Sequence, residues 1–237
     1  MDIHKPKPFH NWREFLKEYG IIVLGVLTAL GLEQAIESWH GREKVEVVRS
    51  SIKEEMRFNL AKADLLAQMQ DCSYRQIEAI AGAIGRNDQA GLRQLLAQDA
   101  LPAATSWNDA AWRAAISSGI SDRLDENERR YLPVAYEVVA ILKDAQQRSV
   151  GSLNRLGLVA QKELSGSSAA PAAELSEFTQ MASALRDLQR AGSALDLLGK
   201  GKLDLEFTPE DQAQVPWQEQ VGKCKAAAAA LGPAAKD

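Results

Sequence analysis

Apolar side chains are distributed along this chain in two ways: in one uninterrupted block near the start, and at every third or fourth position over most of the rest. The block covers residues 19–32, which include no charged side chain, and its apolar character continues to Trp39. Residues 19 and 39 are about 30 Å apart along a helix at about 1.5 Å per residue, which matches the hydrocarbon core of a bilayer. The pattern therefore predicts a transmembrane helix over residues 19–39.

Aromatic residues mark both ends of this segment. Tyr19 and Trp39 lie where the two membrane interfaces would be, and Trp12 extends the aromatic belt on the N-terminal side. The alternatives are a buried core helix of a soluble protein and the apolar region of a signal peptide. A cleaved signal is disfavoured, because cleavage after Ala29 or Ala35 would leave a large or charged residue at the −3 position.

Small and acidic residues form one stripe on the predicted transmembrane helix, because Gly25, Ala29, Glu33 and Glu37 follow one another at four-residue steps. Small residues at this spacing allow a second helix backbone to approach closely. Two interpretations of Glu33 stay open. A charged carboxylate that faces lipid is costly. Either the Glu33 carboxylate extends to the outer interface, or Glu33 packs with Gln34 against a partner helix. The stripe predicts a helix-packing face.

Beyond residue 40 the apolar positions recur at helical spacing. Residues 41–85 contain no proline and predict one long amphipathic helix that continues from the transmembrane helix. Residues 175–198 carry the most regular repeat and predict another helix. Helix starts are predicted at Asp88, at Thr208 followed by Pro209, and at Ser106, whose spacing from Asp109 is that of a capping box. The predicted fold class is all-α: an N-terminal transmembrane helix running into a long amphipathic helix, followed by an exported helical bundle.

This pattern divides the chain into five parts. The predicted linker, residues 165–173, has the small and uncharged sequence SGSSAAPAA. The parts are a cytoplasmic tail with an interfacial helix (1–18), the transmembrane helix (19–39), the first part of the bundle (40–164), the linker (165–173) and the C-terminal part of the bundle (174–237).

Composition agrees with a helical protein and argues against one class of partner. Hydrophobic residues make up 46% of the chain and aromatic residues 6%, which favours helix over sheet. The net charge of −4 gives no electrostatic support for binding nucleic acid, so no nucleic-acid partner is expected. Basic residues before the apolar block outweigh those after it by a small margin. This favours a cytoplasmic N-terminus and an exported body.

The chain has two cysteines, Cys72 and Cys224. If the body is exported, they lie in an oxidising compartment and predict one disulfide between the beginning and the end of the bundle. The alternative is two separate buried thiols.

Candidate chemistry is sparse. All three histidines lie beside the apolar block, so the body lacks the commonest metal ligand and near-neutral base, and we expect no enzyme activity and no cofactor. Trp107, Trp112 and Tyr136 form an aromatic cluster, which predicts either a ligand pocket or, as the favoured interpretation, core packing. Carboxylate pairs such as Glu54 and Glu55 predict solvated helix faces.

One resemblance extends this interpretation. Glu18, Val23, the segments 25–27, 29–30 and 33–34, and Trp39 resemble the N-terminus of a broad group of uncharacterised proteobacterial single-pass membrane proteins. Residues 107–142, with Trp112, Gly119 and Tyr136, resemble the same group. The resemblance implies one N-terminal transmembrane helix with a helical soluble region behind it, and it implies no activity. Together with the charge bias of the flanks, it places the expected location in the bacterial inner membrane, with a periplasmic C-terminal domain.

The sequence therefore predicts a membrane-anchored helical scaffold or accessory subunit. Its expected partners are membrane lipid and either a second copy of the chain or another membrane protein. The alternative hypothesis is a periplasmic ligand-sensing bundle that passes a signal to a partner protein.

Overall fold

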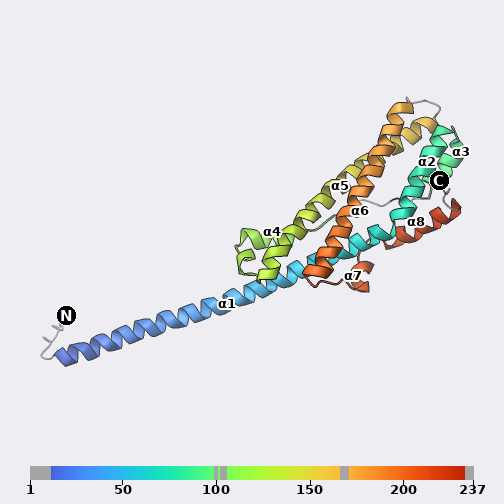
Figure 1. The fold of residues 1–237 in the computed structure, drawn as a ribbon. Helices are drawn as coiled ribbons and strands as arrows, with labels where there is room; N and C mark the ends of the chain where they lie inside the picture. Colours follow the sequence, from blue (N-terminus) through green and yellow to red (C-terminus); the bar gives the residue numbers. More distant parts are fainter. Residues whose placement is uncertain (1–11, 99–100, 102–105, 166–170, 233–237) are drawn as a thin grey trace, which may run out of the picture. The chain divides into compact units, whose positions relative to one another are not determined.

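The computed structural model describes residues 12–98, 101, 106–165 and 171–232, and all regular structure among them is helical (Figure 1). The predicted all-α class is confirmed for these residues. The chain divides into two units, residues 1–47 and 48–237, each of which is described by itself. The helices are α1 (Trp12–Gln68), α2 (Gln70–Gly85), α3 (Gln89–Leu96), α4 (Ala110–Ser117), the 3-10 helix η1 (Ser121–Arg123), α5 (Glu126–Leu164), α6 (Pro171–Lys202), α7 (Pro209–Ala213) and α8 (Gln218–Ala230).

Two of the three predicted helix starts are confirmed. The Asp88 carboxylate accepts a hydrogen bond from the backbone N–H of Gly91, at 2.8 Å, at the start of α3. Thr208 and Asp211 form a reciprocal capping box at the start of α7, with Pro209 in the first turn. These side chains stabilise the helices because they bond backbone N–H groups that have no partner within the helix.

The third predicted start is wrong. Helix α4 begins at Ala110 rather than after Ser106, and Asp109 at its N-cap makes no side-chain bond to the helix backbone. The Asp109 carboxylate pairs instead with Arg113 (3.1 Å) and Lys143 (2.6 Å). Ion pairs with residues of two helices have therefore replaced the local cap that the sequence spacing predicted.

The predicted long helix over residues 41–85 is interrupted. Helix α1 ends at Gln68 and α2 begins at Gln70, with the buried Met69 between them. The Met69 N–H still bonds the carbonyl of Leu65 at 3.2 Å, so the interruption is a bend without a loop. No glycine or proline marks it in the sequence.

The core of the unit formed by residues 48–237 lies where α1, α5 and α6 meet. Ile52, Met56 and Leu60 of α1 are at most 1% exposed. A Cβ atom added to Gly199 of α6 would lie 2.6 Å from a methyl group of Leu60, and one added to Gly192 would lie 3.6 Å from the Ala63 side chain. Glycine at these positions therefore lets the backbone of α6 approach α1. Helices α5 and α6 pack against each other as an antiparallel pair (Figure 1).

Part of the predicted domain organisation falls outside the described residues. This applies to residues 1–11 of the predicted tail and to residues 166–170 of the predicted linker. Residues 171–173, which the linker prediction included, belong to the first turn of α6.

Candidate functional site

The residues of the predicted anchor all lie in α1. Most of its apolar side chains are exposed, with 71% of Ile21 and 68% of Leu24 accessible, and so are the predicted interface anchors Trp12, Tyr19 and Trp39. Among the described residues, α1 is the helix that is long and apolar enough to cross a membrane, and none of its most apolar window is buried.

The predicted helix-packing face is open in the same unit. Gly25, Ala29 and Glu33 are exposed, and Glu37 also lies within α1. A Cβ atom added at Gly25 would meet nothing within 4 Å. The described part of this face, from Gly25 to Glu33, is therefore open to a second helix.

The three residues of the predicted aromatic cluster are buried and packed. The rings of Trp112 and Tyr136 stack with centroids 5.3 Å apart and planes at 5°. Trp107 packs instead edge to face against Trp217, at 6.4 Å. Each of the four side chains is at most 8% exposed, so the rings fill the interior in the way that the core-packing interpretation expects.

A set of polar side chains on α1 fixes the segment that leads into α4. Glu55, Asn59 and Lys62 share one face of the helix, because they are spaced by four and three residues. Asn59 donates to the carbonyl of Asn108 at 2.7 Å and accepts from the N–H of the same residue at 3.0 Å. We call these three side chains, together with the backbone of residues 106–111 that they bind, the backbone clasp.

Glu55 is the end of the backbone clasp that also reaches α5. Its carboxylate accepts hydrogen bonds from the backbone N–H of Ala111, at 3.0 Å, and from the hydroxyl of Tyr136, at 2.7 Å. Burial, reinforced by the bond to Glu55, raises the pKa of the Tyr136 hydroxyl far above its usual value. The hydroxyl therefore stays protonated as a donor and links α1, α4 and α5 through one carboxylate.

Lys62 forms the other end of the backbone clasp and is 1% exposed. Its ammonium group donates to the carbonyl of Ser106 and lies over the rings of Phe58 (4.2 Å) and Trp107 (5.8 Å). Burial lowers the pKa of Lys62 to about 8, although the nearby Glu55 carboxylate acts in the opposite direction. The aromatic faces and the carbonyl partly replace the water that this charge has lost.

Sequence reasoning missed the backbone clasp. Glu55 was expected on a solvated face, and the structure corrects this, because its carboxylate is bonded by Ala111 and Tyr136. A row of polar residues on an amphipathic helix normally predicts exposure. One sequence feature could have indicated the backbone clasp. Glu55 and Asn59 each precede a core position, Met56 and Leu60, so the polar row that they form with Lys62 borders the buried face of the helix.

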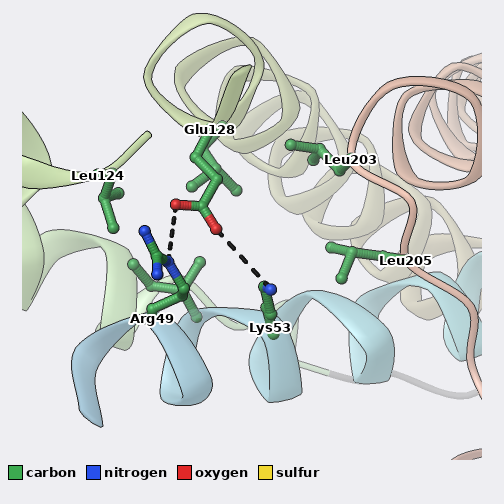
Figure 2. Close-up of a pocket in the computed structure, with 8 residues that line it drawn as sticks. Arg49, Lys53, Leu124, Glu128, Leu203 and Leu205 are labelled. Atoms are coloured by element: carbon green, nitrogen blue, oxygen red, sulfur yellow. Dashed lines mark hydrogen bonds and ion pairs between the residues drawn. The ribbon is translucent and has the colours of Figure 1, made fainter. Parts of the chain in front are cut away.

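A second buried charge lies between α1 and α5 (Figure 2). Glu128 is 8% exposed and pairs with Arg49 at 2.9 Å, while Lys53 lies 3.9 Å away. Leucines surround this group, including Leu124 and Leu205. The enclosed space is about 10 Å³, which is room for one water molecule and not for an organic ligand. These charges hold two helices together.

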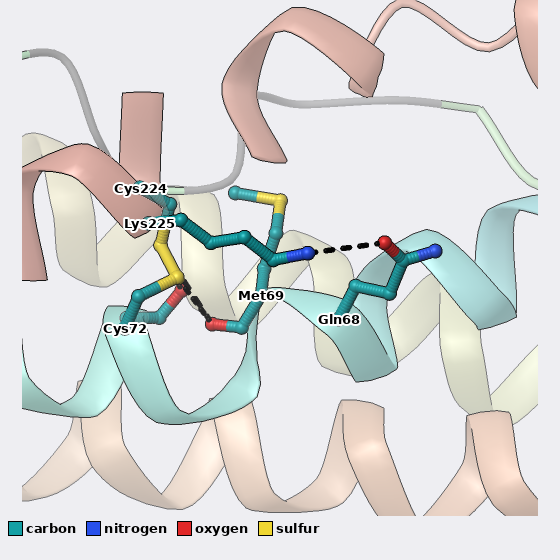
Figure 3. The surroundings of a disulfide bond; sticks show 6 residues. Gln68, Met69, Cys72, Cys224 and Lys225 are labelled. Carbon is teal, nitrogen blue, oxygen red and sulfur yellow. Dashed lines mark hydrogen bonds between the residues drawn. A yellow bond between two sulfur atoms is a disulfide. The ribbon is translucent and has the colours of Figure 1, made fainter. Parts of the chain in front are cut away.

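The structure brings the two cysteines to disulfide distance, as the sequence predicted (Figure 3). Cys72 on α2 and Cys224 on α8 have Sγ atoms 1.90 Å apart and Cα atoms 5.5 Å apart. Next to them, Lys225 donates to the side chain of Gln68 at 3.4 Å. The pair connects the two ends of the bundle across 152 residues of sequence.

Within the part of the chain that the structure describes, no cluster of three or more histidine, cysteine, aspartate or glutamate side chains is placed to hold a metal ion. Comparison with protein-family models, with curated proteins and with solved structures finds no match to this chain.

Proposed function

We propose that this chain is a non-enzymatic, single-pass membrane protein whose exported helical body acts as a scaffold or accessory subunit. The anchor is residues 19–39, and the partner is a second copy or another membrane protein that packs on the face of Gly25, Ala29, Glu33 and Glu37. On this proposal the chain resides in a bacterial inner membrane, with residues 48–237 in the periplasm, as the charge bias of the two flanks favours.

The exposure of the apolar side chains of α1 is the observation that supports this proposal most strongly. A core helix of a soluble protein buries such side chains, because each large apolar side chain that is buried stabilises the fold by about 1.5–3 kcal/mol. Ile21, Leu24 and Leu27 are each at least 60% exposed, so the described side chains of residues 12–47 leave them largely uncovered. A lipid bilayer is the environment that makes this exposure favourable.

The body contributes a second line of support. Cys72 and Cys224 lie at disulfide distance, and a disulfide persists in an oxidising compartment. The ligand-sensing alternative receives no comparable support from Trp107, Trp112 and Tyr136, whose rings are packed in the core.

The packing face is tested by the double substitution Gly25→Leu with Glu33→Leu. Bulk at Gly25 keeps a second backbone at a distance, and the Glu33 change removes a polar group that a partner helix would bond. We expect the variant, purified in nanodiscs, to lose its oligomeric mass or its co-purified membrane partner. Light scattering and mass photometry measure the first, and quantitative mass spectrometry of the purified sample measures the second.

Gly31→Leu is the matched control, because it lies six residues from Gly25, or about 240° around the helix at about 100° per residue. A Cβ atom has open space at both positions. The control should keep the mass and partner of the natural chain. If Gly25→Leu with Glu33→Leu leaves both unchanged, the face is not an interface and this part of the proposal is wrong.

A further inference from the structure

The unit formed by residues 48–237 has two surface grooves that each contain two arginines. The groove between α5 and α6 has a volume of about 400 Å³ and is lined by Arg148 and Arg155. The groove between α2 and α6 has a volume of about 620 Å³ and is lined by Arg186 and Arg190. Both volumes are within the range of small-molecule sites.

The arginines of the α5–α6 groove are neutralised within the protein. Arg148 pairs with Asp144 at 3.0 Å and with Asp187 at 2.9 Å. Arg155 pairs with Glu177 at 2.6 Å. This groove therefore has no cation available to bind an anionic ligand.

The arginines of the α2–α6 groove differ in this respect. Among the described residues neither Arg186 nor Arg190 forms an ion pair, and both are exposed. They lie one turn apart on α6, so their guanidinium groups project from the same face. No carboxylate lines this groove.

The remaining lining residues complete a site with a polar and an apolar part. Tyr74 is half-buried and its hydroxyl makes one long hydrogen bond, 3.4 Å, to the carbonyl of Ala182. Arg186, Arg190 and the Asp187 carboxylate all act electrostatically on this hydroxyl, and the hydroxyl lines the groove together with the two arginines. Ala194 and Leu197 form an apolar wall, and Leu197 is 73% exposed. Further polar groups come from Gln70, Gln189 and Ser193.

We propose that the α2–α6 groove binds the phosphate group of a molecule that also carries an apolar chain. The two guanidinium groups would donate to the phosphate oxygens, and the Tyr74 hydroxyl would exchange its long bond to the Ala182 carbonyl for one to phosphate. The apolar chain would lie on Ala194 and Leu197. The planar guanidinium group binds phosphate through two parallel, charge-assisted hydrogen bonds, which two oxygens of the phosphate accept. An anionic phospholipid and a soluble phosphate ester both present this chemistry.

The test uses the full chain in phosphatidylcholine nanodiscs and octyl phosphate as the probe, with binding measured by calorimetry. Arg186→Gln with Arg190→Gln should weaken binding by at least about ten-fold, since two charge-assisted contacts are lost. Arg93→Gln with Arg123→Gln is the matched control. It removes the same charge from two exposed positions outside the groove and should change binding by less than about two-fold.

Two further arms sharpen the result. Arg186→Lys with Arg190→Lys keeps the charge but loses the two-pronged geometry, and an intermediate loss is expected. Replacing phosphatidylcholine by phosphatidylglycerol in the nanodiscs separates the two sources of phosphate. If the ligand is a lipid headgroup, the apparent affinity for octyl phosphate falls in the natural chain. If it is a soluble ester, the affinity stays the same.

The proposal is overturned if the natural chain binds octyl phosphate no better than the Arg186→Gln with Arg190→Gln variant. It is also overturned if the control substitutions weaken binding equally, because the effect would then be general electrostatics. A matching unfolding midpoint for all variants shows that the body stays folded. The outcome is independent of the packing face on α1, because none of the groove residues lies there.

Discussion

Lys62 is a buried cation, and its titration should make the unfolding free energy of the body rise with pH in the alkaline range. Its pKa is lowered from 10.5 to about 8 in the folded chain. Between these two values the unfolded chain binds the proton and the folded chain does not. The unfolding free energy should therefore rise with pH in this window, by about 2 kcal/mol between pH 8 and pH 10. Below pH 8 both states are protonated and Lys62 contributes no pH dependence.

The measurement compares the natural chain with Lys62→Met by urea unfolding in non-ionic detergent, followed by tryptophan fluorescence. The groups that face Lys62, which include Glu55 of α1 and Lys143 of α5, are present in both proteins. The difference in unfolding free energy between the two proteins therefore isolates Lys62. We expect it to grow in favour of the natural chain as pH rises above 8. Parallel pH profiles would show that the amine is not desolvated as described.

Gly199 shows how a residue without a side chain determines the approach of two helices. Alanine at this position would place its methyl group 2.6 Å from Leu60, which is fully buried and has little room to move. We expect Gly199→Ala to destabilise the body by about 1–3 kcal/mol through overpacking. Chemical denaturation of the purified chain measures this loss.

Gly157→Ala is the control for the helix propensity of the same substitution. Gly157 lies in α5, is exposed, and has open space around the position of a Cβ atom. Alanine there should stabilise the helix by about 0.5–1 kcal/mol. Equal effects at the two glycines would mean that α6 does not approach α1 as closely as the structure has it.

At the scale of elements, the sequence predicts what is local and misses what is tertiary. The α6 repeat and the caps at Asp88 and Thr208 depend on neighbours within one or two turns, so their spacing is sufficient to predict them. The bend at Met69 has no local cause in glycine or proline. The start of α4 differs from its prediction because residues of α1 and α5 bind the segment that would have formed the extra turn.

In the candidate site, too, the sequence predicts local features and misses contacts between distant segments. The aromatic residues Trp112 and Tyr136 were predicted to lie close together, and their rings stack. Trp217 was not predicted as a neighbour of Trp107, since 110 residues separate them. Glu55, Asn59 and Lys62 have the spacing of a solvated helix face. Their role in the backbone clasp depends on a distant segment that covers them.

The link between Cys72 and Cys224 joins α8 to α2. In the loop-entropy model a link across 152 residues stabilises the folded chain by about 5 kcal/mol. We expect Cys72→Ala with Cys224→Ala to lower the unfolding free energy by about 2–5 kcal/mol. The amides of α8 should then exchange with solvent before those of α2, because α8 packs on α2, whereas α2 packs on α3 and α6 as well.

Hydrogen exchange with mass spectrometry on the natural and cysteine-free chains measures this order. Arg75 still donates to the carbonyl of Gly232 in the variant, and Lys225 to Gln68, so α8 should remain docked at equilibrium. The prediction fails if all helices gain exchange to the same extent, which would indicate that the link stabilises the body only as a whole.

At the scale of the whole molecule, the two units of the chain have surfaces suited to different environments. Residues 12–47 expose apolar side chains that a bilayer would cover, whereas residues 48–237 bury a core with paired charges around it. The weak charge difference between the two flanks of the anchor does not determine orientation strongly. The cysteines offer a more direct indicator, because their oxidation state reports the compartment of the body.

Thiol labelling of the full chain in bacterial cells therefore tests the proposed topology. Cells are treated with acid to stop thiol exchange, the protein is denatured without reductant, and free thiols are alkylated with a reagent that adds mass. If the body is exported, Cys72 and Cys224 are joined and no label is added until a reductant is supplied. A body on the cytoplasmic side would give two labels at once, because the glutathione pool keeps its thiols reduced.

Cys224→Ala is the control, since its single remaining thiol must be labelled in either compartment. Two labels on the natural chain would contradict an exported body while leaving the anchor itself in place.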